Sequence, residues 1–273
     1  STVNPVSLDL VYNSSYAMRY GEENYDAGSW LGLGMHVGAG VNLSVMQRVE
    51  KIELQNDSNA NNKSTYMKYT DGDGTIHYFA KDSSKDANYY YDEDGMGLKI
   101  NEYRTGCYMI SDDKDNEMYF VNGHLTLIND ANGNEIQIHY THSDGTSASN
   151  GYPNASGDRI SKIVQKNTGG SAITVATFAY NSSNWLSSIT DAAGNVYNFT
   201  YSSGKLTKIS RGSTVLAQYG AASTRMSYAY DAEAKYGVAF TYSAGKISSY
   251  YEITSASTAA KPGAIVEVGH LEN

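Results

Sequence analysis

Residues 119–140 read YFVNGHLTLINDANGNEIQIHY, and residues 178–201 follow the same plan with FAYNSSNWLSSITDAAGNVYNFTY. Both stretches contain an Asp-x-x-Gly-Asn segment, which starts at Asp130 in the first and at Asp191 in the second. The two segments are 61 residues apart, and the tyrosines that end the two stretches keep the same spacing. A register kept over this distance indicates an internal repeat and therefore a repetitive architecture.

A finer period of about 20 residues divides each copy. Residues 200–206 read TYSSGKL and recur as TYSAGKI at residues 241–247. Aromatic residues alternate with small ones in each unit, which is the period of a strand with one buried face. Gly-Lys-Leu and Asp-x-x-Gly-Asn are turn sequences, because glycine accepts a positive φ and aspartate bonds its own backbone. Each unit therefore predicts two strands and two turns.

Stacked units of this kind predict an all-β fold. In it, antiparallel β-hairpin repeats stack into a continuous antiparallel ribbon with cross-strand aromatic ladders. The residues that define the repeat are Leu125, Ile128, Asp130, Gly133, Tyr140, Tyr180, Leu186, Ile189, Asp191, Gly194, Tyr201, Gly204, Leu206, Ile209, Tyr242, Gly245 and Ile247.

The repeat is regular over residues 118–254 only. Residues 1–117 are predicted to form a degenerate N-terminal β part, and residues 255–273 a C-terminal strand or tail that continues into a longer protein. No helix is predicted. Residues 82–97 and 142–158 are polar and rich in Gly, Ser and Asp, so both are predicted to be exposed loops.

The composition narrows the range of partners. The chain has 25 tyrosines, 26 glycines and 3 prolines in 273 residues, which suits strands and turns. Its net charge of −9 repels a polyanion, and Lys and Arg are scattered singly, so nucleic-acid binding is not expected. No apolar run approaches the roughly 18 residues of a membrane span, so membrane insertion is not expected. The single cysteine, Cys107, allows no intramolecular disulfide.

The units resemble the YD repeats of the Rhs family, whose pattern is roughly Gly-x-Leu-x-x-Ile-x-Asp-x-x-Gly-Asn followed by an aromatic-x-Tyr strand. The N-terminal part is similar to the segment that opens many such regions. It has a Leu-x-x-x-Tyr-Asn-Ser element at residues 8–14, a Gly- and Trp-containing piece at residues 28–32 and an Asp-Gly hairpin at residues 73–79. The resemblance covers nearly the whole chain and lies in the order of its elements.

This resemblance implies a fold, a location and a set of partners. The implied fold is all-β, with antiparallel β-hairpin repeats in a long curled or spiralling sheet that forms part of a shell. In bacterial Rhs-type proteins, toxin-complex shell proteins and teneurins, such a ribbon winds into a hollow shell, and in wall-associated proteins it forms a surface stalk or body. The resemblance thus implies a secreted or bacterial cell-surface location. It also implies partners within the same polypeptide, namely further YD repeats and an effector domain. The family's Asp-Pro-x-Gly-Leu self-cleavage plug has no counterpart at residues 130–133 or 191–194.

Candidate metal and catalytic residues have simpler structural explanations. Residues 71–82 superficially resemble a calcium loop, but the sixth position is Ile76 where glycine is needed, so a turn is expected. The acidic run 112–117 is expected to be a hairpin tip. His139 and His142 would point to opposite faces of a strand, which disfavours zinc, and Cys107 is expected to be a core residue. We therefore predict no metal, no cofactor and no catalytic site.

Aromatic residues are the strongest binding candidates. Flat apolar rings with a polar rim suit stacking on sugars, so Trp30, Tyr89, Tyr90, Tyr91 and Trp185 are candidate glycan-binding residues. The alternative is that the tyrosines only form the ladder of the repeat. Because Tyr89–Tyr91 depart from the repeat pattern beside an acidic loop, they are predicted to be the exposed ones.

Three functional hypotheses follow in order of preference. The first is a non-catalytic structural module that scaffolds or encapsulates a C-terminal effector domain. The second is a carbohydrate- or cell-surface-binding module. The third, a glycoside hydrolase, needs two carboxylates about 5 to 10 Å apart in a cleft, whereas the carboxylates here lie mainly in turns. Unpaired sheet edges further predict edge-to-edge self-association.

Overall fold

The computed structural model describes residues 7–18, 32–56, 58, 61–154 and 157–257. The fold is all-β: among the described elements only α1 (Ser14–Met18) and a short 3-10 turn, η2 (Ser149–Gly151), are helical. The strands are β1 (Leu10–Tyr12), β2 (Val41–Leu43), β3 (Arg48–Gln55), β4 (Lys63–Thr70), β5 (Ile76–Ala80), β6 (Tyr89–Asp92), β7 (Lys99–Arg104), β8 (Cys107–Ser111), β9 (Glu117–Val121), β10 (His124–Asn129), β11 (Glu135–Thr141), β12 (Arg159–Lys166), β13 (Ala172–Tyr180), β14 (Leu186–Asp191), β15 (Val196–Ser202), β16 (Lys205–Arg211), β17 (Thr214–Ala222), β18 (Arg225–Asp231), β19 (Tyr236–Ser243) and β20 (Lys246–Ile253).

The chain divides into two compact units. Unit 1 comprises Ser1–Val11, Leu31–Gly34 and Leu43–Thr177, and unit 2 comprises Tyr12–Trp30, Met35–Asn42 and Phe178–Asn273. This division by compactness falls within β13, whereas the predicted division at residues 117 and 118 marks where the sequence repeat becomes regular. The two boundaries therefore describe different properties of the chain.

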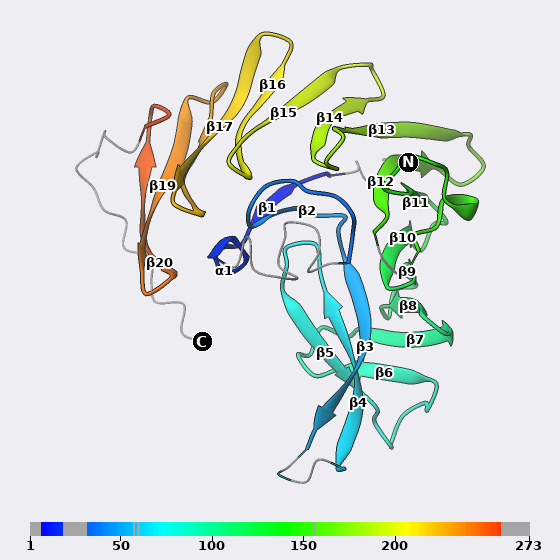
Figure 1. Cartoon of the computed structure of the whole chain (residues 1–273). Coiled ribbons are helices and arrows are strands. Elements are labelled where there is room, and N and C mark those ends of the chain that lie inside the picture. Colours follow the sequence, from blue (N-terminus) through cyan, green and yellow to red (C-terminus); the bar gives the residue numbers. More distant parts are fainter. Residues whose placement is uncertain (1–6, 19–31, 57, 59–60, 155–156, 258–273) are drawn as a thin grey trace. The chain divides into compact units, whose positions relative to one another are not determined.

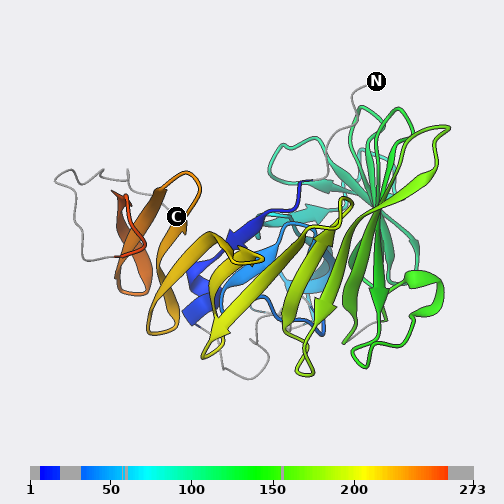
Figure 2. The same cartoon turned by 90° about the horizontal axis from the view of Figure 1, so that it is seen from above.

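Unit 1 contains β3 to β12 and most of β13, and each strand is antiparallel to the next one along the chain (Figures 1 and 2). Strand β10 has a second partner, because His124 pairs with Arg48 of β3. Two backbone hydrogen bonds flank this pair: Val49 N–H donates to the Gly123 carbonyl at 2.9 Å, and Leu125 N–H donates at 3.4 Å to the carbonyl of Gln47, the residue before β3. This pairing closes β3 to β10 into a ring of eight strands.

The core of unit 1 follows the alternation of side chains along the strands. Phe120 and Ile138 are buried, whereas their chain neighbours Tyr119 and His139 remain partly exposed. Cys107 is also buried, as expected of a core residue. The most deeply buried large side chains of the strands are Met67, Phe79, Ile100, Ile110, Phe120, Leu125, Ile138, Tyr140, Ile160 and Ile163.

Unit 2 contains β14 to β20, and residues outside the repeat complete its interior. The hydroxyl of Tyr12 lies 3.2 Å from that of Tyr242 and accepts the Met226 N–H at 2.8 Å. Helix α1 contacts β18 and β20, and its Ala17 is fully buried. The segment 35–42 hydrogen-bonds the hairpin turns, for example from the Ala39 N–H to the carbonyl of Gly204 at 2.9 Å.

The Asp-x-x-Gly-Asn segments form the predicted turns. At both Asp130 and Asp191, the Oδ1 atom accepts the N–H groups of the residues two and four positions later, each at 2.9 Å. The same arrangement recurs at Asp71 and Asp112, within the part of the sequence that looks degenerate. The turn at Asp112 is the predicted hairpin tip. The turn chemistry of the repeat thus extends further toward the N-terminus than its sequence pattern.

The second turn of each unit is the tight one. Asn122 and Gly123 have φ values of 50° and 81°, and Ser203 and Gly204 have φ values of 47° and 74°. Positive φ at both central residues defines the mirror-image turn whose twist matches that of the flanking strands. The short Gly-containing turns predicted from the sequence therefore have a clear backbone reason.

Three tyrosines at equivalent positions of the repeat bind the preceding strand. The hydroxyls of Tyr140, Tyr201 and Tyr242 donate to the carbonyls of Leu125, Leu186 and Met226 at 2.7, 2.8 and 2.5 Å. A β-bulge lies beside each of the three tyrosines, where the register of its strand pair shifts. This contact joins a tyrosine hydroxyl to a backbone carbonyl and so differs from the predicted cross-strand ladder of aromatic rings.

Three local expectations are wrong. Residues 82–97 are not one loop, because β6 forms there and Tyr90 pairs with Ile100. Residues 142–158 are not uniformly exposed, since Pro153 and Asp158 are buried. A helix also forms where none was predicted: the Asn13 side chain accepts the Ser15 N–H at 2.9 Å and so caps α1.

Candidate functional site

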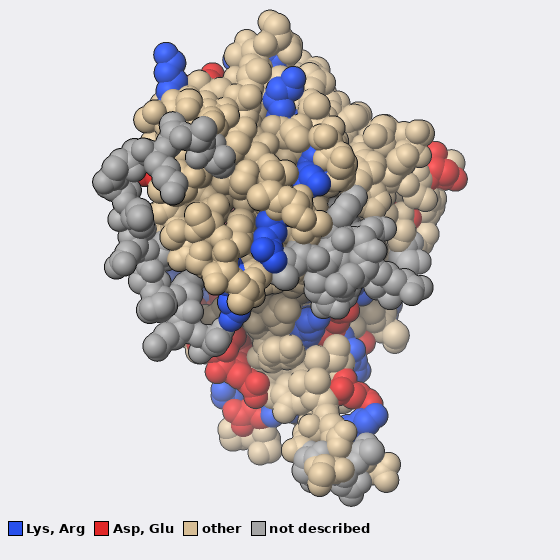
Figure 3. Space-filling view, turned by 60° about the vertical axis from the view of Figure 1, so that its left-hand side comes forward, with Lys and Arg blue, Asp and Glu red and all other residues tan. Residues whose placement is uncertain are grey.

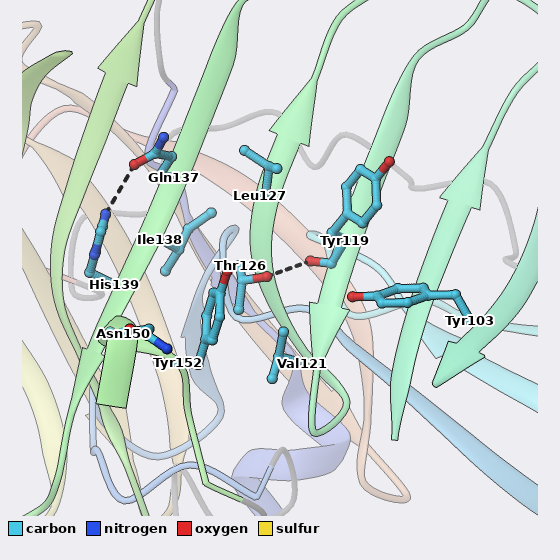
Figure 4. Close-up of a pocket in the computed structure, with 11 residues that line it drawn as sticks. Tyr103, Tyr119, Val121, Thr126, Leu127, Gln137, Ile138, His139, Asn150 and Tyr152 are labelled. Atoms are coloured by element: carbon cyan, nitrogen blue, oxygen red, sulfur yellow. Dashed lines mark hydrogen bonds between the residues drawn. The ribbon is translucent and has the colours of Figure 1, made fainter. Parts of the chain in front are cut away.

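A pocket of about 310 Å³ lies on unit 1, between β7, β9, β10 and β11 and the segment that contains η2 (Figure 4). It is lined by Tyr103, Tyr119, Val121, Thr126, Leu127, Gln137, Ile138, His139, Asn150, Gly151 and Tyr152.

The strands place the pocket on the face of the sheet opposite the core. Tyr119 and Val121 are two positions apart on β9, as are Gln137 and His139 on β11, so each pair shares a face. On β10 the register shifts between residues 125 and 127, which marks a bulge at Thr126. The hydroxyl of Thr126 donates to the Tyr119 carbonyl at 3.1 Å. Sheet alternation and one bulge therefore build the floor of the pocket.

The connection between β11 and β12, described over residues 142–154 and 157–158, forms the wall through Asn150, Gly151 and Tyr152. Its two ends are joined, because His142 Nδ1 lies 2.9 Å from the carboxylate of Asp158. Its middle is fixed to a neighbouring hairpin by the Asn122 side-chain amide, which donates to the Pro153 carbonyl at 2.7 Å. Gly151 has a φ of +71°, and a Cβ atom there would lie 2.6 Å from His139 Nδ1, so glycine lets the loop approach β11. The wall is therefore tethered at several points.

The polar groups of the pocket are uncharged at neutral pH. The Tyr119 hydroxyl donates to Glu117 at 2.7 Å, and burial together with this carboxylate raises the pKa of Tyr119 to about 12. Burial and then the nearby Lys162 lower the pKa of His139 below its usual value. The imidazole Nε2 of His139 lies 3.2 Å from Gln137 Oε1 (Figure 4). The arrangement offers neutral hydrogen-bonding groups beside aromatic rings.

The five aromatics predicted to bind glycans do not form one surface. Trp30 lies outside the described residues. Tyr90 is buried, so its predicted exposure is wrong. A lysine ammonium lies over each ring of the Tyr89–Tyr91 run, at 4.6 Å for Tyr89, 4.1 Å for Tyr90 and 4.6 Å for Tyr91. Trp185 packs against Tyr201 and His36, with ring centroids 4.9 and 5.0 Å away.

The repeat-defining residues mostly lie in cores or turns. Leu125, Leu186 and Leu206 are buried, and the aspartates and glycines form the turns. The exception is Ile247, whose side chain is 41% exposed. This residue belongs to the loosest sequence copy of the repeat.

Other clusters of polar residues have structural partners. His77 bridges the carboxylates of Asp71 and Asp94 at 2.8 and 3.0 Å, and these bonds join two neighbouring turns. Within the described residues, no group of three or more His, Cys, Asp or Glu side chains is arranged to hold a metal ion. Also within that part of the chain, no helix is long and apolar enough to cross a membrane. On the face shown in Figure 3, Lys and Arg side chains stand apart from one another.

Comparison with known proteins gives no family. No family model matches the chain, and no curated protein matches it either. Among solved structures, it is similar to TcdB2-TccC3 without its hypervariable C-terminal region, with 9% identity over 77% of this chain and a TM-score of 0.38. It is also similar to TcdB2-TccC3, with 11% identity over 74% and a TM-score of 0.34. A third similar structure is the Tc holotoxin pore of Photorhabdus luminescens with a mutated TccC3, with 9% identity over 76% of this chain and a TM-score of 0.22.

This chain spans 12, 12 and 13% of the lengths of those three structures. With these identities and TM-scores, the relation to Rhs proteins read from the sequence motifs stays a prediction.

Proposed function

We propose that this chain is a non-catalytic structural module of a larger secreted or cell-surface protein. In this role its hairpin repeats scaffold or enclose another domain of the same polypeptide. The observation that carries the proposal is the repeated tyrosine contact: Tyr140 in unit 1 and Tyr201 and Tyr242 in unit 2 bind equivalent carbonyls. One contact reused in alternate hairpins, on β11, β15 and β19, is what a scaffold built by stacking similar units requires.

The use of the carboxylates supports a structural role. Both carboxylate oxygens of Asp130 and Asp191 accept hydrogen bonds within their own turns. The side-chain amides of Asn134 and Asn195 donate to the second oxygen at 2.7 and 2.8 Å. These amides lower the pKa of both carboxyls. An aspartate held ionised in a turn is poorly suited to act as a general acid.

The test is protease protection in the full-length polypeptide that contains this module. We expect a neighbouring domain to resist proteolysis when the module is intact, and to be digested when Leu125→Asp disrupts the core of unit 1. The exposed Ile247→Asp change is the matched control and should leave protection unchanged. Equal digestion of that domain with the intact and the disrupted module would reject the scaffold role.

Carbohydrate or cell-surface recognition is the second candidate function. The observation that favours it is the tyrosine-lined pocket of unit 1, rather than the five aromatics predicted from the sequence. Edge-to-edge self-association also stays a prediction. Light scattering that shows a monomer at all concentrations would count against self-association.

A further inference from the structure

We propose that the pocket lined by Tyr103, Tyr119 and Tyr152 binds a single uncharged sugar ring, such as the terminal residue of a glycan. The proposal rests on the second candidate function and gives it a site and a ligand class. It does not depend on the scaffold role.

Two tyrosine rings are available to a ligand. The side chains of Tyr103 and Tyr152 are 51% and 48% exposed, and they reach the pocket from β7 and from the end of η2. Tyr103 meets Tyr119 edge to face, with centroids 6.1 Å apart and an interplanar angle of 69°. Half-exposed rings beside a concave floor are suited to pack against the C–H face of a sugar, because one part of each ring is apolar and its hydroxyl is polar.

The polar groups favour a neutral ligand with many hydroxyls. Asn150 presents a side-chain amide, and His139 presents an imidazole that is uncharged at neutral pH because its pKa is lowered. The amide of Gln137 also lines the pocket, where it donates to Glu135 at 2.7 Å and lies 3.2 Å from His139. Amides and a neutral imidazole both donate and accept hydrogen bonds, as hydroxyl groups require. None of the described residues that line the pocket carries a formal charge at neutral pH. The carboxylates of Glu117 and Glu135 hydrogen-bond the lining residues Tyr119 and Gln137, so an anionic ligand is disfavoured.

The size of the pocket limits the ligand. A volume of about 310 Å³ is at the lower end of the range of small-molecule sites, roughly 300 to 1,000 Å³. One ring fits such a space better than an extended chain. The ligand is therefore a monosaccharide or the end of an oligosaccharide.

The wall of the pocket is an insertion into the repeat. Other hairpins turn in a few residues, such as Asn122–Gly123 and Ser203–Gly204, whereas residues 142–158 form a long connection between β11 and β12. Insertions in repeat proteins commonly build the binding face. Pro153 and Asp158 on this connection are held by hydrogen bonds, which lowers the cost of ordering the neighbouring Tyr152 on binding.

The proposal is tested by saturation-transfer NMR on the full chain. The probes are the methyl glycosides of glucose, galactose, mannose and N-acetylglucosamine, with methyl glucuronide as the charged comparison. We expect at least one neutral glycoside to bind and the glucuronide not to bind. A trisaccharide that ends in the preferred sugar then distinguishes a glycan end from a free monosaccharide as the ligand. Tighter binding of the trisaccharide than of the methyl glycoside indicates a glycan end, and equal affinity indicates the free sugar.

Three variants locate the site. Tyr152→Ala should weaken binding at least tenfold, whereas Tyr152→Phe, which keeps the ring, should change it less than threefold. Tyr236→Ala removes a tyrosine of unit 2 with similar exposure, 45%, and should have no effect. A two-dimensional amide spectrum of each variant shows whether it is folded, and Tyr103→Ala repeats the test if Tyr152→Ala is not.

Two results would overturn the proposal. One is that no neutral glycoside binds; binding of the aromatic probe N-acetyltyrosinamide alone would then leave a binding function but reject a sugar ligand. The other is glycoside binding that Tyr103→Ala and Tyr152→Ala leave unchanged. Neither result bears on protease protection by the scaffold.

Discussion

Units 1 and 2 use the same hairpin turns and the same tyrosine contact, yet their interiors differ. In unit 1, the strands β3 to β10 close into a ring, and strand side chains such as Phe79, Phe120 and Ile138 are almost completely buried. In unit 2, β15 alternates between exposed and half-buried side chains along its whole length. Repeat residues therefore specify hairpins, while strand closure and non-repeat segments decide how deeply a hairpin is buried.

Unit 2 shows how residues outside the repeat supply an interior. Ala17, Met35 and Val37 are fully buried, and none of them belongs to a hairpin. Tyr12 reaches the Tyr242 hydroxyl from outside the repeat as well. In unit 2, non-repeat segments thus provide the buried interior that strand closure provides in unit 1.

The largest expected effect comes from the core of the ring. Phe120→Ala should lower the free energy of unfolding by about 3–5 kcal/mol, because it leaves a cavity where the side chain is fully buried. Ile247→Ala in unit 2 should cost less than about 0.5 kcal/mol, because this side chain is already exposed. Urea unfolding of both variants measures the difference, and similar costs would contradict the contrast between the units.

Acid should weaken unit 1 through His124. This side chain is 1% exposed, and neither ring nitrogen has a hydrogen-bond partner among the described residues. Burial, followed by the charge of Arg48, lowers its pKa to about 3, while the charge of Asp158 acts in the opposite direction. The folded state therefore excludes a proton that the unfolded chain binds below its pKa of about 6.5.

The sign of the effect follows from this difference. The contribution of neutral His124 to the free energy of unfolding is complete above pH 6.5. It is lost as the pH falls toward 3, by about 1.4 kcal/mol per pH unit. His124→Leu should remove this component of the pH dependence and cost little at pH 7, because no hydrogen bond is lost. Urea unfolding between pH 7 and pH 4.5 compares the two proteins. Identical slopes would show that His124 is not the group responsible.

A smaller difference in stability is expected between two glycine turns, one packed against β3 and one open to solvent. Gly194→Ala should cost about 1 kcal/mol, because φ is +84° there but no atom lies within 4 Å of a new Cβ. Gly123→Ala should cost roughly twice as much or more, since its Cβ would lie 2.6 Å from the Val49 carbonyl oxygen of the closing pair. Thermal unfolding of the two variants gives the comparison, and equal losses would argue against a close approach at Gly123.

The sequence predicts the local structure well because local chemistry determines it. An aspartate that bonds the amides two and four positions later needs only its own turn, so Asp130 and Asp191 are readable from the pattern. The closure of unit 1 depends on Arg48 meeting His124, which are far apart in the chain and share no motif. Short-range periodicity contains no information about such a pair.

The candidate site was missed for the same reason. Its residues come from four strands and one loop, and each looks ordinary in its own segment. The predicted aromatics were chosen because flat apolar rings suit stacking on sugars, but nearby lysines lie over the Tyr89–Tyr91 rings. The useful signal was the length of the 142–158 connection, with Tyr152 inside it.

The closure of β3 to β10 is most directly tested by a nuclear Overhauser effect between the Hα atoms of Arg48 and His124. The flanking hydrogen bonds make these residues a non-hydrogen-bonded antiparallel pair, in which the two Cα atoms come closest. We predict a strong cross-peak between them, as strong as those between β8 and β9. Its absence from a spectrum that shows the β3–β4 cross-peaks would mean that the ring is open.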